Sequence, residues 1–166
     1  MALDPQLTSL VVPVEELTRI EDVLSRLVEE TNGNHALLLD KSGQVIASHG
    51  DANRQDTTAL GALIAGTFAS SREVAKLLRE KDFRVLFQQG VRENLFIALI
   101  GEQWILTIIF SKETHIGLVK VLVKKASEEL QGSLGRVRQT RRVRDDVLGA
   151  NFRTSMEDTI DLLFRD

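Results

Sequence analysis

The chain has 166 residues, of which 43% are hydrophobic and 27% are charged, and its formal net charge is -3 at pH 7. This composition is typical of one globular domain, and the small negative charge gives no overall attraction to nucleic acid or to anionic membranes. Because the sequence contains no Cys, disulfides, thiol nucleophiles and thiolate metal sites are excluded.

The amino-terminal stretch MALDPQLTSL has neither a basic region nor a continuous apolar core, so we expect no signal peptide. The uncharged stretch 57–71 is too short, and too rich in Gly, Ser and Thr, to span a bilayer, which takes about 20 apolar residues. We therefore expect a cytoplasmic protein without direct membrane insertion.

The first element is a helix after Pro13, since apolar residues recur there at helical spacing and the pair Asn32 and Gly33 provides a left-handed end. Two short β-rich runs follow, HALLLD and QVIASH. They flank the turn residues KSG and predict a hairpin.

A long second helix is capped by Asp56 or Thr57 and runs to about Glu80. Three more strands follow, RVLFQQ, NLFIALIG and QWILTIIF, and a third long helix extends from about His115 to Leu134. The order α-β-β-α-β-β-β-α predicts a mixed α/β domain of the α+β type, with helices packed on a five-stranded antiparallel sheet.

The second helix carries the main functional signal. Leu60, Ile64, Phe68, Val74 and Leu78 form a stripe that can cover the sheet. Its other side consists of small residues: Gly61, Ala62, Ala65, Gly66, Ala69 and Ser70. A solvated face normally carries Lys and Glu, so we interpret this one as a packing surface for another chain, the alternative being a helix buried on both sides in its own domain.

The tail is different in character. Five arginines crowd residues 136–144, and a short amphipathic helix follows with its apolar positions at Met156, Ile160, Leu163 and Phe164. About ten residues are marginal for an isolated helix, so this one should dock on a partner or fold back on its own domain. We divide the chain into an N-terminal extension (1–14), a folded domain (15–135), an Arg-rich linker (136–153) and a C-terminal helix (154–166).

Three segments, ALLLDKSGQVIASHG, DTTALGALIAGTFASSREVAKLL and IIFSKETHIGLVKVLVKKASEEL, resemble the Roadblock family of small dimeric modules in order and spacing. Within that family they are most similar to bacterial gliding-motility and polarity proteins. The resemblance implies a profilin-like fold and a homodimer formed through the second helices and the third strands. It also implies that the dimer is a GTPase-activating protein for a small Ras-like GTPase and supplies no arginine finger.

Carried onto this sequence, the resemblance implies three groups of residues. The GTPase would contact Ala62, Ala65, Ala69, Arg72 and Glu73; the dimer interface would contain Gly66, Ser70, Arg84, Val85, Phe87 and Gln89; the C-terminal docking helix would use Met156, Ile160, Leu163 and Phe164. Related sequences often keep small residues where this chain has Arg72 and Glu73, which leaves the identity of the GTPase open.

Other sites are poorly supported by the sequence. His35, His49 and His115 lack metal-ligand spacing and suit strand or cap positions, so we expect no metal and no cofactor. No phosphate-binding GxxxxGK[ST] motif is present, so the chain itself should bind no nucleotide. As a GTPase regulator, which the resemblance implies, it should have no catalytic site of its own. The arginine cluster has no aromatic neighbours for base stacking, which argues against a nucleic-acid site.

Two alternatives to the GTPase regulator remain at this point. A Roadblock scaffold would bind a motor, receptor or signalling protein without changing nucleotide hydrolysis. A small-molecule sensor would need a cavity under the sheet, where ILTIIF and LFIALI offer bulky side chains and few polar groups.

Overall fold

The computed structural model describes residues 12–51 and 56–164, and within the last helix it describes the side chains outside 138–148. Most of the expected N-terminal extension lies outside these residues. The elements follow the predicted order: α1 Val14–Thr31, β1 Gly33–Asp40, β2 Val45–Gly50, α2 Thr57–Leu77, β3 Val85–Gln89, β4 Glu93–Ile100, β5 Trp104–Ser111 and α3 Ile116–Leu163.

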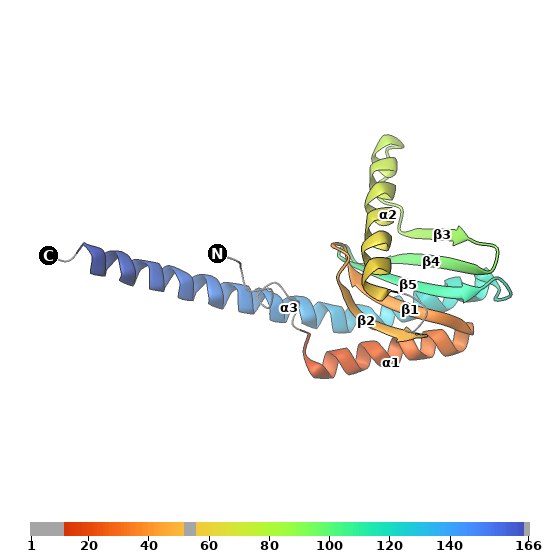
Figure 1. Ribbon diagram of the computed structural model, residues 1–166, viewed down its shortest axis with the longest axis horizontal. Coiled ribbons are helices and arrows are strands. Elements are labelled where there is room, and N and C mark those ends of the chain that lie inside the picture. Colours follow the sequence, from red (N-terminus) through yellow and green to blue (C-terminus); the bar gives the residue numbers. More distant parts are fainter. Residues whose placement is uncertain (1–11, 52–55, 165–166) are drawn as a thin grey trace.

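The five strands form one antiparallel sheet in the order β2-β1-β5-β4-β3 (Figure 1). The first and last strands of the chain pair in its middle, where Leu38 lies opposite Leu106, and β4 continues the ladder with Ala98 opposite Leu106. As a result β2 and β3 are the two edge strands. The predicted sheet is confirmed.

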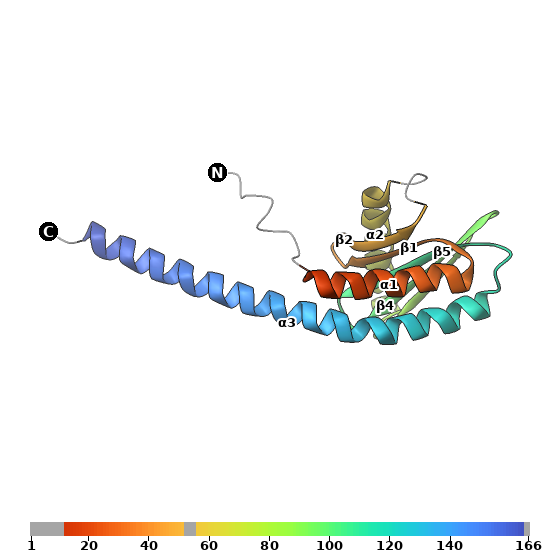
Figure 2. The ribbon, with the colours of Figure 1, turned by 90° about the horizontal axis from the view of Figure 1, so that it is seen from below.

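Helices cover both faces of this sheet. Helices α1 and α3 lie side by side on one face, and α2 lies on the other (Figure 2). The first core contains Leu24, Leu38, Leu106 and Val123, and the second is built around Ile64 and Phe68 of α2. Strand residues alternate between the two cores, which is why β1, β4 and β5 are apolar along most of their length.

Two helix ends follow directly from local chemistry. Asn32 ends α1 in a left-handed conformation with φ 49°, and its N–H bonds to the carbonyl oxygens of Val28 and Glu29. The Asp56 carboxylate accepts hydrogen bonds from the backbone N–H groups of Thr58 and Ala59 and caps α2. Both caps agree with the sequence-based prediction.

The third helix differs from the prediction. It does not end near Leu134 but continues as one helix to Leu163, so the tail is not a separate short helix. Gly149 costs about 1 kcal/mol relative to Ala inside a helix, but it ends a helix only when it takes a left-handed conformation, and here its φ is not positive. Helix-forming neighbours therefore carry α3 through Gly149. Figure 2 shows this arm extending away from the domain.

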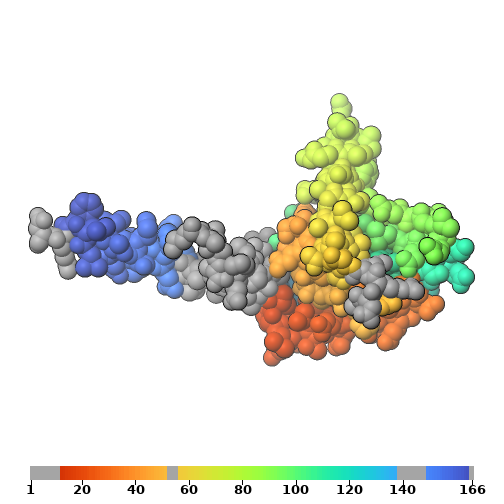
Figure 3. Space-filling view, in the orientation of Figure 1, coloured from red at the N-terminus to blue at the C-terminus, as the bar shows by residue number. Residues whose placement is uncertain are grey.

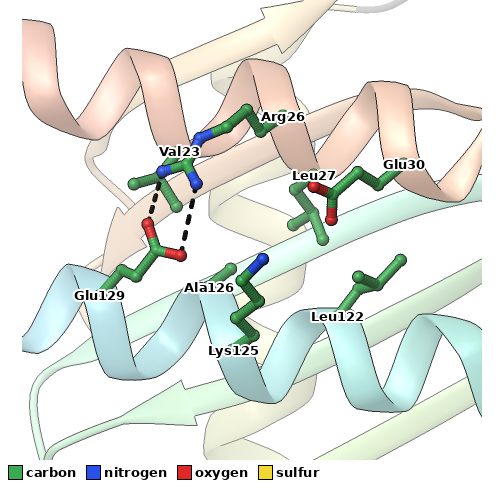
Figure 4. Close-up of a pocket in the computed structure, with 8 residues that line it drawn as sticks. All are labelled: Val23, Arg26, Leu27, Glu30, Leu122, Lys125, Ala126 and Glu129. Atoms are coloured by element: carbon green, nitrogen blue, oxygen red, sulfur yellow. Dashed lines mark hydrogen bonds and ion pairs between the residues drawn. The ribbon is translucent and has the colours of Figure 1, made fainter.

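Polar contacts join α1 to α3 along their common border. The Arg26 guanidinium pairs with the carboxylate of Glu129 beside a shallow groove (Figure 4). Leu27 and Leu122 also line this groove, whose cavity volume is about 10 Å³, the size of one water molecule. Nearer the N-terminus of α1, Arg136 donates hydrogen bonds to the buried carboxylate of Glu16. Helix α3 is thus fixed to the domain as far as residue 137.

Candidate partner-binding surface

The outward side of α2 carries small residues that touch little of their own domain. Ala62, Gly66, Ala69 and Ser70 are all exposed. A methyl group placed on Gly66 would meet no atom within 4 Å. We call these four residues the open face of α2. Because it offers neither bulk nor charge, another backbone can approach it closely.

Two residues expected on that side lie elsewhere. Ala65 is 6% exposed and packs in the core beneath α2, and Gly61 is buried against the turn between β1 and β2. A methyl group on Gly61 would lie 2.7 Å from Val45 Cγ2 and 2.9 Å from the carbonyl oxygen of Gly43. The placement of Gly61 and Ala65 on the bare side was therefore wrong. At these two positions the small side chains let the helix approach its own sheet.

The C-terminal half of α2 extends beyond the sheet and stands out from the body of the molecule (Figure 3). Val74 is 48% exposed and Leu78 62%, so these residues do not cover the sheet as predicted. Leu77, which the sequence analysis did not single out, is 85% exposed. Large apolar side chains so exposed at one helix end indicate a surface that another chain covers.

The predicted charged pair beside the open face takes part in local ion pairs. Arg72 Nε lies 3.2 Å from the carboxylate of Asp82, and Glu73 pairs with Lys76 at 2.7 Å. Lys41 lies close by, and burial together with the positive charge of Arg72 lowers its pKa. Asp82 therefore holds the Arg72 guanidinium next to the open face.

The predicted dimer strand β3 is an edge strand with an unpaired outer side. Val85 is 46% exposed, and Gln89 is also exposed. Phe87 stacks on Phe110 with ring centroids 6.3 Å apart, so part of its surface serves its own domain. Arg84 donates a hydrogen bond to the carbonyl oxygen of Gly101 at 3.0 Å. The backbone N–H and C=O groups on the outer side of this edge strand, together with the exposed Val85, suit pairing with another strand.

The predicted docking residues of the tail lie far along α3. Met156, Ile160 and Leu163 are 50%, 47% and 75% exposed, and Phe164 is the exposed residue at the helix end. They do not fold back onto the domain. Phe152, one turn before Met156, is also 66% exposed and was missed, although its four-residue spacing from Met156 would have identified it.

The three histidines occupy β1, β2 and the N-cap of α3, as expected. Burial lowers the pKa of His35, and the backbone of Asp51 acts in the opposite direction. The buried hydroxyl of Thr107, on the neighbouring strand, has no hydrogen-bond partner. Among the side chains that the structure describes, in residues 12–51, 56–137 and 149–164, no group of three or more His, Asp or Glu could hold a metal ion.

The chain resembles known proteins in both sequence and structure. The family model of the Roadblock/LC7 domain matches residues 19–110. The structure is similar to Myxococcus xanthus MglB with a TM-score of 0.73 and 38% identity, covering 77% of this chain and 96% of that one. It is also similar to the gliding protein MglB from Thermus thermophilus, with a TM-score of 0.69, 32% identity, and 79% and 97% coverage.

A third similar structure is described as MglB with a tetrameric arrangement; its TM-score is 0.74 at 30% identity, with 81% of this chain and 99% of that chain covered. No curated protein matches the sequence. Among the helices of the described part of the chain, none is long and apolar enough to cross a membrane.

Proposed function

Because this chain belongs to the Roadblock/LC7 family, we propose that it is a homodimeric GTPase-activating protein for a small Ras-like GTPase of the MglA type. The similarity to two MglB structures at more than 30% identity supports this assignment. The observation that carries it is the open face of α2, an uncharged helix surface that the chain's own domain leaves exposed.

In the proposed dimer, the C-terminal halves of two α2 helices pack together and two β3 strands pair at their edges. Val74, Leu77 and Leu78 would then be covered, which explains why such large apolar side chains end a helix in a single protomer. Val85 and Gln89 would lie at the strand junction. Gly66 and Ser70 would permit the close approach of the helices.

The paired helices would offer Ala62 and Ala69, with the flanking Arg72 and Glu73, to the switch regions of the GTPase. The buried Ala65 is not part of this platform. Phosphoryl transfer depends on positioning and charge stabilisation, so a regulator can accelerate it by moving the GTPase's own catalytic groups into place. We therefore assign no arginine finger to this chain and no catalytic site of its own.

The arm of α3 has a separate role in this proposal. Its residues Met156, Ile160, Leu163 and Phe164 would dock on the GTPase away from the nucleotide and promote exchange. The proposal includes a role in gliding motility or cell polarity and location at the cell pole; the similarity to the gliding protein MglB supports the first of these.

The experiment that tests the function is single-turnover GTP hydrolysis by the small GTPase encoded in the same genome, with and without this protein. We expect faster hydrolysis, and Ala69→Arg should abolish the acceleration because it places a long charged side chain on the open face. Glu21→Arg adds the same side chain to the exposed side of α1 and should have no effect.

Binding without faster hydrolysis would contradict the proposal and favour the second candidate, a Roadblock scaffold. That alternative uses the same open face and the same dimer. Absence of both binding and acceleration would contradict the choice of GTPase as partner.

A further inference from the structure

The outer side of the first turns of α3, which faces away from the sheet, is unusually apolar for a solvated surface. Leu118 is 47% exposed and Val121 65%. Lys125 and Glu128 continue the same stripe at spacings of four and three residues, and both are exposed. Alternation of three and four residues is the spacing of a helix seam that faces another helix. We call these four residues the proximal stripe.

The far end of the same helix carries the same pattern in reverse. Arg153, Met156, Ile160 and Leu163 are exposed at spacings of three, four and three residues. We call them the distal stripe. Read from Leu163 backwards, the order is two apolar residues, the long side chain of Met156 and a base; read from Leu118 forwards, it is two apolar residues, the long side chain of Lys125 and an acid.

The two stripes match residue for residue when two copies of α3 lie antiparallel to each other. Each proximal position then lies at the level of one distal position: Leu118 with Leu163, Val121 with Ile160, Lys125 with Met156, and Glu128 with Arg153. All four pairs share one two-fold axis, which crosses α3 between residues 140 and 141. Two of the pairs join apolar residues, the Lys125 stem lies level with Met156, and the acid Glu128 lies level with the base Arg153.

Charge on the flanks follows the same symmetry. Lys120 and Lys124 lie beside the apolar end of the proximal stripe, whereas Glu157 and Asp161 lie beside that of the distal stripe. In the antiparallel arrangement the basic turns of one helix lie at the same level as the acidic turns of the other. A parallel arrangement would instead bring like charges level, and repulsion would disfavour it.

We propose that a second copy of this chain packs antiparallel along α3, with the distal stripe of each copy on the proximal stripe of the other. The interface is self-complementary and closes on itself, as a two-fold interface does. It is separate from α2 and β3, so it joins two copies whether or not the Roadblock dimer forms. It covers Met156, Ile160 and Leu163, which are proposed above to dock on the GTPase, so pairing of copies withholds the arm from that partner.

Disulfide trapping tests this geometry, and the natural chain has no Cys to interfere. Purified Val121→Cys and Ile160→Cys proteins, mixed and oxidised without any GTPase, should give a cross-linked heterodimer. Within one α3 these positions are about 58 Å apart, so they meet only between copies. Asp158→Cys is the matched control, because it lies in the same turn as Ile160 but on the opposite side of the helix.

A cross-link yield with Ile160→Cys no higher than with Asp158→Cys would overturn the proposal, as would efficient self-linking of Val121→Cys, which indicates parallel helices. A Val121→Cys/Ile160→Cys double variant that forms its disulfide within one chain would also overturn it, because the arm would then fold back on its own domain.

Charge exchange provides an independent measurement. Glu128→Arg should weaken self-association about tenfold in sedimentation equilibrium, since each interface contains two copies of the Glu128 and Arg153 pair. Glu128→Arg combined with Arg153→Glu should restore it. A double variant no better than the single one would contradict the pairing, provided that circular dichroism shows both variants folded.

Discussion

Arg136 donates hydrogen bonds from two guanidinium nitrogens to the two carboxylate oxygens of Glu16, which precedes it by 120 residues. The contact lies where α3 leaves the domain, one residue before the buried Val137. It therefore fixes the direction in which the arm departs. The hydrogen bond with Arg136 is the largest of the influences that lower the pKa of Glu16.

This lowered pKa determines how stability depends on pH. The ionised Glu16 stabilises the fold above its ordinary pKa of 4.5, and that contribution is lost as the pH falls through the lowered pKa. Glu16→Gln should therefore lower the melting temperature at pH 7 and have much less effect at pH 3. Thermal melts at the two values measure it. An equal loss at both would show that packing, not charge, makes the contribution.

Gly61 and Gly66 should respond in opposite ways to the same added methyl group. Gly61→Ala pushes against Val45 and the backbone of Gly43, and should cost about 1–3 kcal/mol of unfolding free energy. In a single protomer, Gly66→Ala meets open space and should add about 0.5–1 kcal/mol, because Ala is the better helix former. Urea unfolding of both variants provides the comparison, at a protein concentration too low for the proposed dimer to form. Equal effects would contradict the orientation of α2.

Thr107 lies in the centre of the sheet with a fully buried, unpartnered hydroxyl. Thr107→Val keeps the shape and removes the polar group, so it should raise the free energy of unfolding by about 1 kcal/mol. Thr107→Ser keeps the hydroxyl and loses a methyl group, so it should be destabilising. If Val lowered stability, the hydroxyl would have a partner that binds it in solution.

His35 makes the fold sensitive to mild acid. Burial lowers the pKa of His35 below the ordinary 6.5. In mild acid the unfolded chain therefore binds a proton at His35 more readily than the folded chain does. As a result, the free energy of unfolding falls as the pH drops below about 6.5. The backbone of Asp51 opposes this effect only in part. His35→Leu should flatten the decline between pH 7 and pH 5 in denaturant titrations. An unchanged slope would show that other groups cause it.

Val85 on the β3 edge should be needed for the proposed Roadblock dimer. Val85→Lys places a charge in the strand junction and should raise the dissociation constant by about tenfold or more, as edge lysines do in natural sheets. Light scattering over a dilution series would measure it. Val91→Lys is the matched control, because Val91 is 86% exposed in the turn beyond the strand.

The sequence predicted the fold well where local chemistry decides the structure. Asp56 and Asn32 marked helix ends through their own hydrogen bonds, and all five strands appeared as β-rich runs between turn residues. The continuous α3 could not be predicted from Gly149 alone. A glycine ends a helix only if the surroundings favour its left-handed conformation, and no local pattern reveals this.

The sequence predicted an exposed face of small residues on α2, but two of the residues assigned to it, Gly61 and Ala65, are buried. Helical spacing gives the side on which a residue lies, but not how much of the helix has a sheet beneath it. Helix α2 has 21 residues and is about 31 Å long, whereas the spacing of five strands covers about 19 Å. The overhang of Val74, Leu77 and Leu78 follows from this mismatch, which appears only when the elements are assembled.

Because of the same overhang, coverage of the end of α2 should depend on the concentration of the protein. In a single protomer, the side chains of Leu77 and Leu78 at the end of α2 are left largely uncovered by their own domain. In the proposed dimer the partner would cover both side chains, and mass action would favour this paired form as the protein concentration rises. The proposed platform for the GTPase would then be complete only above the concentration at which two copies pair.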